Sequence, residues 1–456
     1  MTLAITAPQE ADTATDVIHV LPSAPAAAPA KAAPSAAAIR PNSDQLLAIE
    51  ALLEYITDPS PPTEFFVFSG FAGTGKTFCM REVVARCAKS HAKFAFTAPT
   101  NKAAKELKKV TGEACTIFSL LGLRIDKSGE VKALVAGKAP NDLSDLDVIF
   151  IDEAGMVNSN LMGIIRTQCQ KYSVKVVFMG DIAQLPPIGE VASPVWDEPT
   201  NAMLTKVMRH DNQILTLVTE LRGVMESITP SVNIRSDNKD GEGVWKRTKM
   251  DFKASIYNAA IAGEFADGSK SKVIAWRNAR VAEYNDLIRS ALFGAEAVPG
   301  FYMPGERIVA ASPCQRGDDM VLTTDEEAIV ESVAVCKHPL EPKYSAIELK
   351  CRTEQNKVIR LLVIHPNSVM QFNNDSQNLA HDAKANSRLW KKFWLHKELF
   401  HDVKYAYALT THRSQGSTYT SVWVDYQDIL LNRNRKEAFQ CLYVACSRAS
   451  KVLNLA

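Results

Sequence analysis

One short segment of the chain has the residue types and spacing of a phosphate-binding loop. Gly70, Gly73 and Gly75 precede Lys76 and Thr77 in the pattern G-x-x-x-x-G-K-T, between an apolar run and an amphipathic one. Glycines let the backbone wrap around a phosphate, and the N–H groups at the start of the following helix attract anions. The lysine ammonium can reach the β- and γ-phosphates, and the threonine hydroxyl can hold Mg²⁺. The segment therefore predicts a nucleoside triphosphate site.

A pair of acidic residues, Asp152 and Glu153, directly follows the apolar run VIFI at 148–151. At the carboxyl end of a strand beside the phosphate loop, Asp152 can join the coordination shell of Mg²⁺. Glu153 can then orient the attacking water and accept its proton as the general base. The two motifs together predict a Mg²⁺-dependent NTPase, and they leave open what the hydrolysis drives.

The segments around these motifs alternate between short apolar runs and amphipathic runs, as strands and helices do in α/β domains. Strands that are apolar nearly throughout are buried on both faces, which favours an open parallel sheet with helices on both sides. In the first half of the chain we expect strands at 64–70, 93–100, 147–155 and 175–181, and helices at 41–56, 77–90 and 102–110. A second unit of the same kind is expected from strands at 272–278, 421–426 and 451–456, and helices at 281–292 and 438–449.

Changes in composition mark the expected domain boundaries. The N-terminal stretch is rich in Ala and Pro, which have little to bury and interrupt helices, so we expect it to be disordered. A later block contains short β-prone runs and is expected to be a β-rich insertion in the second α/β domain. The expected parts are the tail at 1–40, a first ATPase domain at 41–200 with a hairpin at about 121–145, a second domain at 201–310 and 403–456, and the β-rich insertion at 311–402.

The overall composition is that of an ordinary globular protein. The 456 residues include 52 Lys and Arg against 51 Asp and Glu, a net charge of +1. Any site for a polyanion must therefore be local and built from a few placed residues. No apolar run reaches the ~18 residues of a membrane span. The nine cysteines show no zinc-ligand spacing, and we expect a cytoplasmic protein with reduced thiols.

Eight further segments, in order along the chain, resemble motifs of the superfamily 1B DNA helicases, the 5′-to-3′ branch that includes Dda-like and RecD-like enzymes. The resemblance covers nearly the whole chain after the tail, and the aromatic segment at 390–400 is most similar to the Dda type. The segments are Asp44-Gln45, 97–104, 116–121, 180–187, 204–209, 272–278 with Asn285, 410–417 and 442–449.

The resemblance implies roles for residues around the nucleotide. Gln45 would read adenine, Gln184 would sense the γ-phosphate, and Gln415 would couple the ATP site to DNA. Arg209 and Arg448, in the second α/β unit, would be arginine fingers that reach ATP only across an inter-domain cleft. The expected catalytic residues are Lys76, Glu153, Gln184, Arg209 and Arg448. The expected ATP-binding residues are Gln45, Gly70, Gly73, Thr74, Gly75, Lys76, Thr77, Arg209, Gln415 and Arg448, with Thr77 and Asp152 on Mg²⁺.

The resemblance also implies a DNA-binding face made largely of short polar side chains, which suit backbone phosphates and sugars. The expected contacts are Pro99, Thr100, Asn101, Lys102, Thr116, Phe118, Asn278 and His412. Phe118, Trp276 and Phe301 are candidates for stacking on bases, with packing in the core as the alternative. The aromatic segment at 390–400 has the same two interpretations, packing against the β-rich insertion or contact with DNA.

Three features depart from the family's pattern. Phe118 stands where the family often has His, so a hydrogen bond is lost there and stacking is the contact left. Gly155 stands where Ser is usual, which removes a hydroxyl beside the acidic pair. The segment 121–145 contains no Phe, Tyr or Trp, which argues against a duplex-splitting pin that relies on aromatic stacking.

The resemblance implies an α/β fold of two RecA-like P-loop domains, with a small hairpin insertion in the first and a β-rich, SH3-like insertion in the second. It implies an ATP-dependent DNA helicase that moves 5′ to 3′ on single-stranded DNA, with ATP and Mg²⁺ as cofactors. Its partners would be single-stranded DNA and single-strand/duplex junctions, with single-strand-binding, replication or recombination proteins as further candidates. A monomeric motor is expected, in the host cytoplasm if the chain is phage-encoded.

Two other functions stay open on the residues alone. An RNA helicase of the same superfamily is one, since contacts to the backbone discriminate poorly between sugars. A nucleic-acid-stimulated translocase or remodeller that displaces proteins is the other, and the aromatic-free hairpin segment favours it. A small-molecule P-loop kinase would leave the motifs after residue 200 unexplained.

Overall fold

The computed structural model describes residues 40–87, 92–125, 131–133, 141–206, 213–225, 227, 231–316 and 319–456. The predicted tail therefore lies outside the described residues, apart from its last position. No helix in the described ranges is long and apolar enough to cross a membrane.

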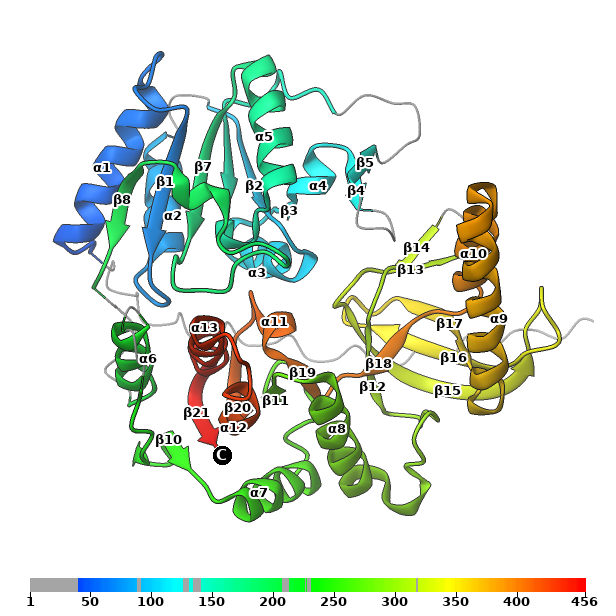
Figure 1. Cartoon of the computed structure of the whole chain (residues 1–456). Helices are drawn as coiled ribbons and strands as arrows, with labels where there is room; N and C mark the ends of the chain where they lie inside the picture. The colour runs from blue at the N-terminus through cyan, green and yellow to red at the C-terminus, as the bar shows by residue number, and fades with distance from the viewer. Residues whose placement is uncertain are drawn as a thin grey trace, which may run out of the picture. The chain divides into compact units, whose positions relative to one another are not determined.

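The first α/β unit is built on a six-stranded sheet in which every strand pair is parallel (Figure 1). Its strands in spatial order are β3 (Cys115–Thr116), β2 (Phe94–Ala98), β6 (Val148–Ile151), β7 (Lys175–Gly180), β1 (Phe65–Gly70) and β8 (Thr200–Leu204). The four central strands were predicted from their apolar runs. The two edge strands were missed, because β3 has two residues and β8 begins with polar residues and is buried only at its last position.

Alternation along β1 buries its side chains on two opposite faces of this sheet, as the pleat requires. Phe66 and Phe68 pack with α1 (Ser43–Thr57), α2 (Lys76–Cys87) and α3 (Asn101–Thr111). Phe65 and Val67 pack instead with α4 (Ile117–Leu120) and α5 (Ser159–Tyr172). Helices on both faces leave only the strand ends free, so functional loops must lie there.

A short antiparallel pair, β4 (Leu123–Ile125) and β5 (Val131–Ala133), follows α4. It is the hairpin expected in this part of the chain. The residues that connect the two strands, 126–130, lie outside the described residues.

The second α/β unit is also a six-stranded sheet. Its spatial order is β19 (Ala408–Thr410), β11 (Ser271–Ala275), β20 (Tyr419–Val424), β21 (Ala449–Leu455), β10 (Glu242–Lys246) and β9 (Asp237–Lys239). Only the β9–β10 pair is antiparallel. One face carries α6 (Gln213–Val224) and α13 (Arg435–Ser447), and the other carries α7 (Lys249–Ile261) and α8 (Asn278–Phe293). The predicted pattern of two doubly covered parallel sheets is confirmed.

Between β11 and β19 the chain forms a five-stranded antiparallel sheet. Its spatial order is β17 (Val358–Ile364), β16 (Ser345–Thr353), β15 (Glu327–Lys337), β12 (Arg307–Ala310) and β18 (Val403–Tyr405). The sheet extends beyond both ends of the predicted block 311–402, because β12 and β18 pair with each other. A further hairpin, β13 (Cys314–Arg316) and β14 (Asp319–Leu322), follows β12. The description of this part as SH3-like stays a prediction.

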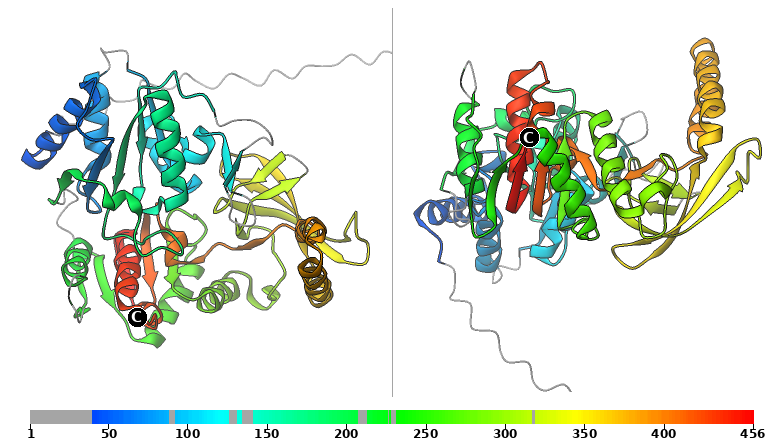
Figure 2. Two further views of the ribbon diagram at one scale, coloured as in Figure 1. Left: turned by 45° about the horizontal axis from the view of Figure 1, so that its top comes forward. Right: turned by 90° about the horizontal axis from the view of Figure 1, so that it is seen from below.

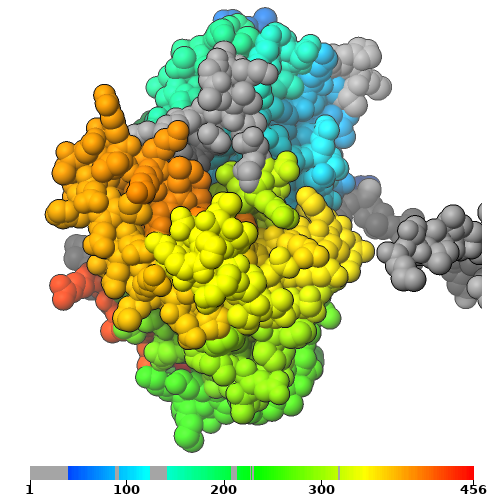
Figure 3. All heavy atoms as spheres, turned by 90° about the vertical axis from the view of Figure 1, so that its right-hand side faces the viewer, coloured from blue at the N-terminus to red at the C-terminus, as the bar shows by residue number. Residues whose placement is uncertain are grey.

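Two helices, α9 (Pro366–Ala385) and α10 (Trp390–Lys397), project from the antiparallel sheet (Figure 2). In the space-filling view they form one continuous surface with its strands (Figure 3). Phe393 contacts both Trp390 and Trp394 edge to face. Phe372 of α9 stacks on His396 with their ring centroids 4.3 Å apart. Packing against the insertion, one of the two interpretations of this aromatic segment, is therefore observed.

Candidate functional site

The glycine loop lies between the end of β1 and the start of α2, with positive φ angles of 78° at Gly73 and 93° at Gly75. Only glycine adopts such angles without strain. A Cβ on Gly75 would also lie 2.5 Å from Nε2 of Gln45, so the loop could not close this tightly with another residue. Thr74 is buried within the loop and donates its hydroxyl to the carbonyl of Phe71.

Lys76 points back over this loop. Its Nζ donates to the carbonyl oxygens of Gly70 at 2.5 Å and of Phe71 at 3.2 Å. These are neutral acceptors, which a phosphate can replace with stronger, charge-assisted hydrogen bonds. Thr77 follows at the first turn of α2, where its hydroxyl lies at the helix start. The predicted phosphate-binding residues are thus gathered in one loop.

Gln45 has a structural role that sequence reasoning missed. Its side chain is buried and donates to the carbonyl of Thr74 at 3.0 Å. Its Oε1 accepts from the backbone N–H of Asn42, whose side chain in turn caps α1 in a capping box. The side-chain amide of Gln45 therefore holds the start of α1 against the phosphate loop. To hydrogen-bond with adenine through Nε2, it must first break its hydrogen bond to the carbonyl of Thr74.

The acidic pair follows β6, as predicted. Asp152 accepts the backbone N–H of Glu153 at 2.9 Å. Glu153 has the left-handed backbone angles φ 53° and ψ 41°, a conformation that costs a non-glycine residue about 1 kcal/mol or more and clusters at functional sites. Among the described residues, neither carboxylate forms an ion pair within 4.0 Å.

The electrostatics of the pair reflect charges from both α/β units. Burial, and next the neighbouring Asp152, raise the pKa of Glu153 well above its usual range, while Arg448 and Lys76 act in the opposite direction. Burial likewise raises the pKa of Asp152, opposed by the charge of Lys76. A bound Mg²⁺ would favour the ionised form of Asp152. The hydroxyl of Thr77 and the carboxylate of Asp152 are oxygen donors of the kind that Mg²⁺ prefers.

Arg448 reaches this region from the end of α13. It is buried, with Nη1 donating to the carbonyl of Ser417 at 3.1 Å and Nη2 donating to Oγ of Ser447 at 2.8 Å. Gln415 is also buried, and its Nε2 has no hydrogen-bond partner within the described part of the chain. Such an unsatisfied donor is costly unless a ligand uses it. Arg209, the other predicted arginine finger, lies outside the described residues.

Tyr443 is a residue that sequence reasoning missed, although it belongs to the last of the eight segments. Its hydroxyl donates to Oδ2 of Asp181 and accepts the backbone N–H of Ala72 in the glycine loop at 3.4 Å. The same oxygen of Asp181 accepts the Ala72 N–H at 3.1 Å. Gln440, one turn earlier on α13, donates to the backbone carbonyl of Gln184. α13 is thus hydrogen-bonded to the loops after both β1 and β7.

Arg222 was also missed. Its guanidinium lies over the ring of Phe71 in the glycine loop, with its carbon 3.6 Å from the ring centroid, in the geometry of a cation–π contact. Arg222 comes from α6 of the second unit. The aromatic residue inside the glycine loop is the only sequence signal that could have suggested such a contact.

The predicted DNA contacts begin where β2 and β3 end side by side, with Ala98 paired to Thr116. Thr100 and Thr116 are the N-caps of α3 and α4, accepting from the N–H groups of Ala103 and Ser119. Their hydroxyls therefore have a structural task whether or not DNA is bound. The N-terminus of α3 is also favourable for a phosphate, because the helix dipole attracts anions there.

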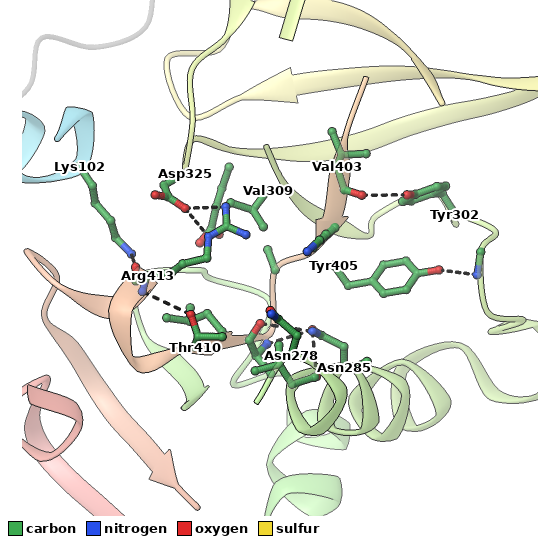
Figure 4. A pocket seen from close by; sticks show the side chains of 18 residues that line it. Lys102, Asn278, Asn285, Tyr302, Val309, Asp325, Val403, Tyr405, Thr410 and Arg413 are labelled. Carbon is green, nitrogen blue, oxygen red and sulfur yellow. Dashed lines mark hydrogen bonds and ion pairs between the residues drawn. The ribbon is translucent and has the colours of Figure 1, made fainter. Parts of the chain in front are cut away.

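Lys102 and Asn278 line one cavity of about 300 Å³, where the first unit, α8 and the antiparallel sheet meet (Figure 4). Lys102 donates to the hydroxyl of Tyr419 at 2.8 Å and contacts the carbonyl of Arg413 at 3.4 Å. Arg413 in turn forms an ion pair with Asp325. A second cavity of about 550 Å³ is lined by Asn101, Lys102 and Thr116 among others. The structure thus brings four of the predicted DNA contacts to two adjoining cavities.

His412 lies elsewhere. It lines a cavity of about 310 Å³ together with the loop Leu185–Val191. In that loop Ile188 and Val191 are 91% and 89% exposed, and sequence reasoning did not select them. Pro99 lies half-buried between β2 and α3.

The aromatic candidates for base stacking are not free. Phe118, Trp276 and Phe301 each pack against a different core cluster and are partly buried. All three side chains therefore pack against the core, which is the alternative that the sequence analysis gave. A side chain half-buried in this way can still offer one edge to DNA, so the predicted contact of Phe118 stays a prediction.

Two protein-family models match this chain, one over its first α/β unit and one at its C-terminal end. A model of an AAA domain matches residues 42–228, and a model of the UvrD-like helicase C-terminal domain matches residues 405–456. Uncharacterized protein R530 of Acanthamoeba polyphaga mimivirus is 23% identical over 90% of this chain and 99% of its own length. ATP-dependent DNA helicase dda of Enterobacteria phage T4 is 23% identical over 83% of this chain and 91% of its own length.

The fold is also similar to that of a Pif1 helicase solved in a study of DNA unwinding at forked duplexes. That likeness has a TM-score of 0.50 at 14% identity and covers 91% of this chain and 92% of the other. The two family models and these relatives make the chain similar to Dda/Pif1-like helicases. This similarity confirms the predicted resemblance, and the likeness between the structures confirms the fold of two RecA-like domains.

Proposed function

We propose that this superfamily 1B helicase hydrolyses Mg-ATP between its two RecA-like units to move 5′ to 3′ along single-stranded DNA and open duplex ahead of it. The proposal rests above all on the contacts between α13 of the second unit and the nucleotide loops of the first, where the hydroxyl of Tyr443 donates to Asp181 and accepts the backbone N–H of Ala72 in the glycine loop. A site completed by residues from both units can couple the chemistry to their relative movement. The proposed division places the RecA-like units at 41–200 and at 201–310 with 403–456, and the insertion at 311–402, with β12 and β18 of the insertion's sheet just outside these bounds.

In the proposed mechanism, Lys76 and the glycine loop bind the β- and γ-phosphates, and Thr77 with Asp152 holds Mg²⁺. A bound Mg²⁺ would supply positive charge beside the phosphates. Glu153 orients water for attack on the γ-phosphorus and accepts its proton, so that ADP and phosphate are released. Arg448, and Arg209 by resemblance, stabilise the negative charge that builds on the γ-oxygens.

The proposed coupling to DNA uses contacts between the units. Lys102 of α3 donates to Tyr419 on β20, and a Cβ on Gly416 would lie 3.1 Å from that of Ala103. Gln415, adjacent to that close approach, is the residue with an unsatisfied amide. Closure of the two units around ATP would give the side-chain amide of Gln415 a hydrogen-bond partner. The same closure would shift α3, which Thr100 caps, relative to the segment that carries His412. Each cycle then moves one group of phosphate contacts relative to the other.

The experiment that tests this function is unwinding of DNA duplexes that carry either a 5′ or a 3′ single-stranded tail, with ATP and Mg²⁺. Lys76→Ala protein serves as the control for contaminating activity. Unwinding of the 5′-tailed duplex alone is expected. Unwinding of the 3′-tailed duplex alone would overturn the proposed direction. Failure on both tails with DNA-stimulated ATPase intact would make the chain a translocase or remodeller.

The proposed nucleic acid is DNA, and the proposed motor is a monomer that binds single-strand/duplex junctions. Matched DNA and RNA oligonucleotides should stimulate the ATPase to different extents, with DNA the stronger. Equal stimulation by RNA would favour the alternative of an RNA helicase. Sedimentation of the protein on a tailed duplex should give one chain per DNA.

A further inference from the structure

Three potential metal ligands of different chemistry meet beside the cavity that contains His412. His412 comes from α11 (Thr411–Ser414), while Glu437 and Cys441 lie one turn apart on α13. The ring nitrogen, the carboxylate oxygen and the sulfur all lie within 4.8 Å of one another. Cys441 follows His412 by 29 positions in a chain without zinc-ligand spacing, so only the fold brings the two residues together.

We propose that His412, Glu437 and Cys441 bind a Zn²⁺ ion, which holds the His412 side chain away from DNA. Nitrogen and thiolate donors select borderline-soft cations such as Zn²⁺ over Mg²⁺ or Ca²⁺. Three protein ligands leave the fourth tetrahedral position to water, as in open zinc sites. The cavity of about 310 Å³ that His412 and Glu437 line gives both the metal and that water a way in.

The present geometry is close to that of such a site. Donors on a tetrahedral zinc lie about 3.5 Å apart, given metal–ligand distances near 2.0–2.3 Å. His412 Nε2 and Glu437 Oε1 are 4.0 Å apart, too far for a hydrogen bond between them. Side-chain rotations that move each donor atom by about an ångström would bring all three within bonding distance of one zinc ion. The 4.0 Å separation therefore suits an ion between the two side chains better than direct contact.

The protonation states also suit metal binding. Burial lowers the pKa of His412, opposed by Glu437, so its imidazole is neutral and has a free lone pair at neutral pH. Burial raises the pKa of Cys441 to about 12, which keeps the thiol protonated until a metal arrives. When the zinc–sulfur bond forms, the S–H bond breaks and the proton leaves to solvent. No oxidant or reductant is involved.

The consequence for DNA rests on the proposed function, because His412 is there a contact to the DNA backbone. A ring nitrogen that is bonded to zinc cannot hydrogen-bond with a phosphate. Zn²⁺ should therefore weaken DNA stimulation of the ATPase while leaving the basal rate unchanged. The zinc site itself can be tested without nucleic acid.

Cobalt(II) is the probe for the site, because a thiolate ligand gives a charge-transfer band in the near ultraviolet and tetrahedral coordination gives strong visible bands. The full-length protein should bind one equivalent of cobalt with both features, and equimolar zinc should abolish them. Cys441→Ala should remove the charge-transfer band, and Glu437→Gln should weaken affinity by at least about tenfold. Cys336→Ala, at a half-buried cysteine on β15, is the matched control and should change nothing.

Absence of the charge-transfer band in the wild-type protein, or its survival in Cys441→Ala, would overturn the site. Melting curves identify a variant that fails to fold, and Glu437→Gln, which keeps the size of the side chain, then carries the test.

The second measurement is DNA-stimulated ATPase with and without equimolar zinc. Zinc should reduce the stimulation in wild-type protein and in Cys336→Ala, but not in Cys441→Ala. Equal inhibition of Cys441→Ala, or none in the wild type, would overturn the effect on His412. If DNA fails to stimulate the wild-type ATPase even without zinc, the proposed function is contradicted instead. The cobalt titration still decides whether the metal site exists, because it uses no nucleic acid.

Discussion

The two RecA-like sheets have similar cores but use the acidic residues at their strand ends in different ways. In the first unit, Asp152 and Glu153 follow β6 and lack a cationic partner within ion-pair distance among the described residues. In the second, Asp425 follows β20 and accepts hydrogen bonds from Arg280 and Tyr284, both at 2.7 Å. Asp428 nearby also forms an ion pair, with Arg277.

In the proposed mechanism, this difference separates a catalytic end of a sheet from a structural one. Carboxylates that are already paired are held at their positions but have no capacity left for a metal or a water. Carboxylates left without a cation are costly to bury, which is why the pKa values of Asp152 and Glu153 are raised. In the proposed mechanism, Mg²⁺ and Arg448 of the second unit would supply the missing positive charge and offset this cost.

The largest effect is expected from Lys76→Ala, which removes the phosphate-binding cation of the first unit. ATP hydrolysis should fall by at least about a thousandfold, while single-stranded DNA binding stays close to that of the wild type. The check pairs a steady-state ATPase assay with fluorescence anisotropy of a labelled oligonucleotide. Normal turnover in this variant would contradict the assignment of the glycine loop.

Arg448→Ala tests whether the second unit contributes to catalysis across the cleft. Turnover should fall by about a thousandfold with a much smaller change in the affinity for ATP, since the finger acts on the transition state. Because the guanidinium also holds the carbonyl of Ser417, Arg448→Lys serves as the matched variant that keeps the charge. Equal losses in turnover and in ATP affinity would indicate a ground-state contact instead.

Glu153→Gln and Asp425→Asn place the same kind of change at the two sheet ends. Glu153→Gln should reduce hydrolysis by about 10²–10⁴-fold and raise the melting temperature at neutral pH. Asp425→Asn should leave the chemistry nearly intact and lower the free energy of unfolding by about 3 kcal/mol, since Arg280 loses its buried partner. Thermal melts and ATPase rates of both variants test this expectation. Loss of stability in Glu153→Gln together with loss of hydrolysis in Asp425→Asn would contradict it.

The pH dependence of Glu153 follows from the sign of its shift. A raised pKa means that the folded protein holds this proton more tightly than the unfolded chain does. Stability should therefore fall as the pH rises from the ordinary range of glutamate through the raised value, and Glu153→Gln should lose that component of the pH dependence. The ionised form is the active base, so wild-type ATPase should fall as the pH drops through the same raised value.

The sequence was sufficient for the central strands and for the phosphate chemistry, because both are local patterns. The run FFVFSG is buried at every position, so its apolar character identifies it without tertiary information. The edge strand β9 and its neighbour β10 were missed because exposed positions within them interrupt any apolar run. β10 is stabilised by pairing with β21, which lies far away in the sequence.

The residues that sequence reasoning missed share a different cause. Tyr443, Arg222 and Gln45 each contact a segment that is distant in the sequence. The separation reaches 371 positions for Ala72 and Tyr443. No local pattern distinguishes a tyrosine that hydrogen-bonds with Asp181 from one in the core. The aromatic DNA candidates show the same limit, since Phe118 and Trp276 pack against cores that only the fold defines.

The smallest expected effect is that of Tyr443→Phe, which tests how the second unit contacts the glycine loop. The change removes one hydroxyl and leaves Asp181 with the N–H of Ala72 as its partner there. A hydrogen bond to a charged group contributes about 1.5–3 kcal/mol, so DNA stimulation of the ATPase should fall by about tenfold while the basal rate changes little. The measurement is the ratio of the two rates. A drop in both rates alike would place Tyr443 in the chemistry of the first unit, and an unchanged ratio would show that α13 communicates with the nucleotide through Arg448 alone.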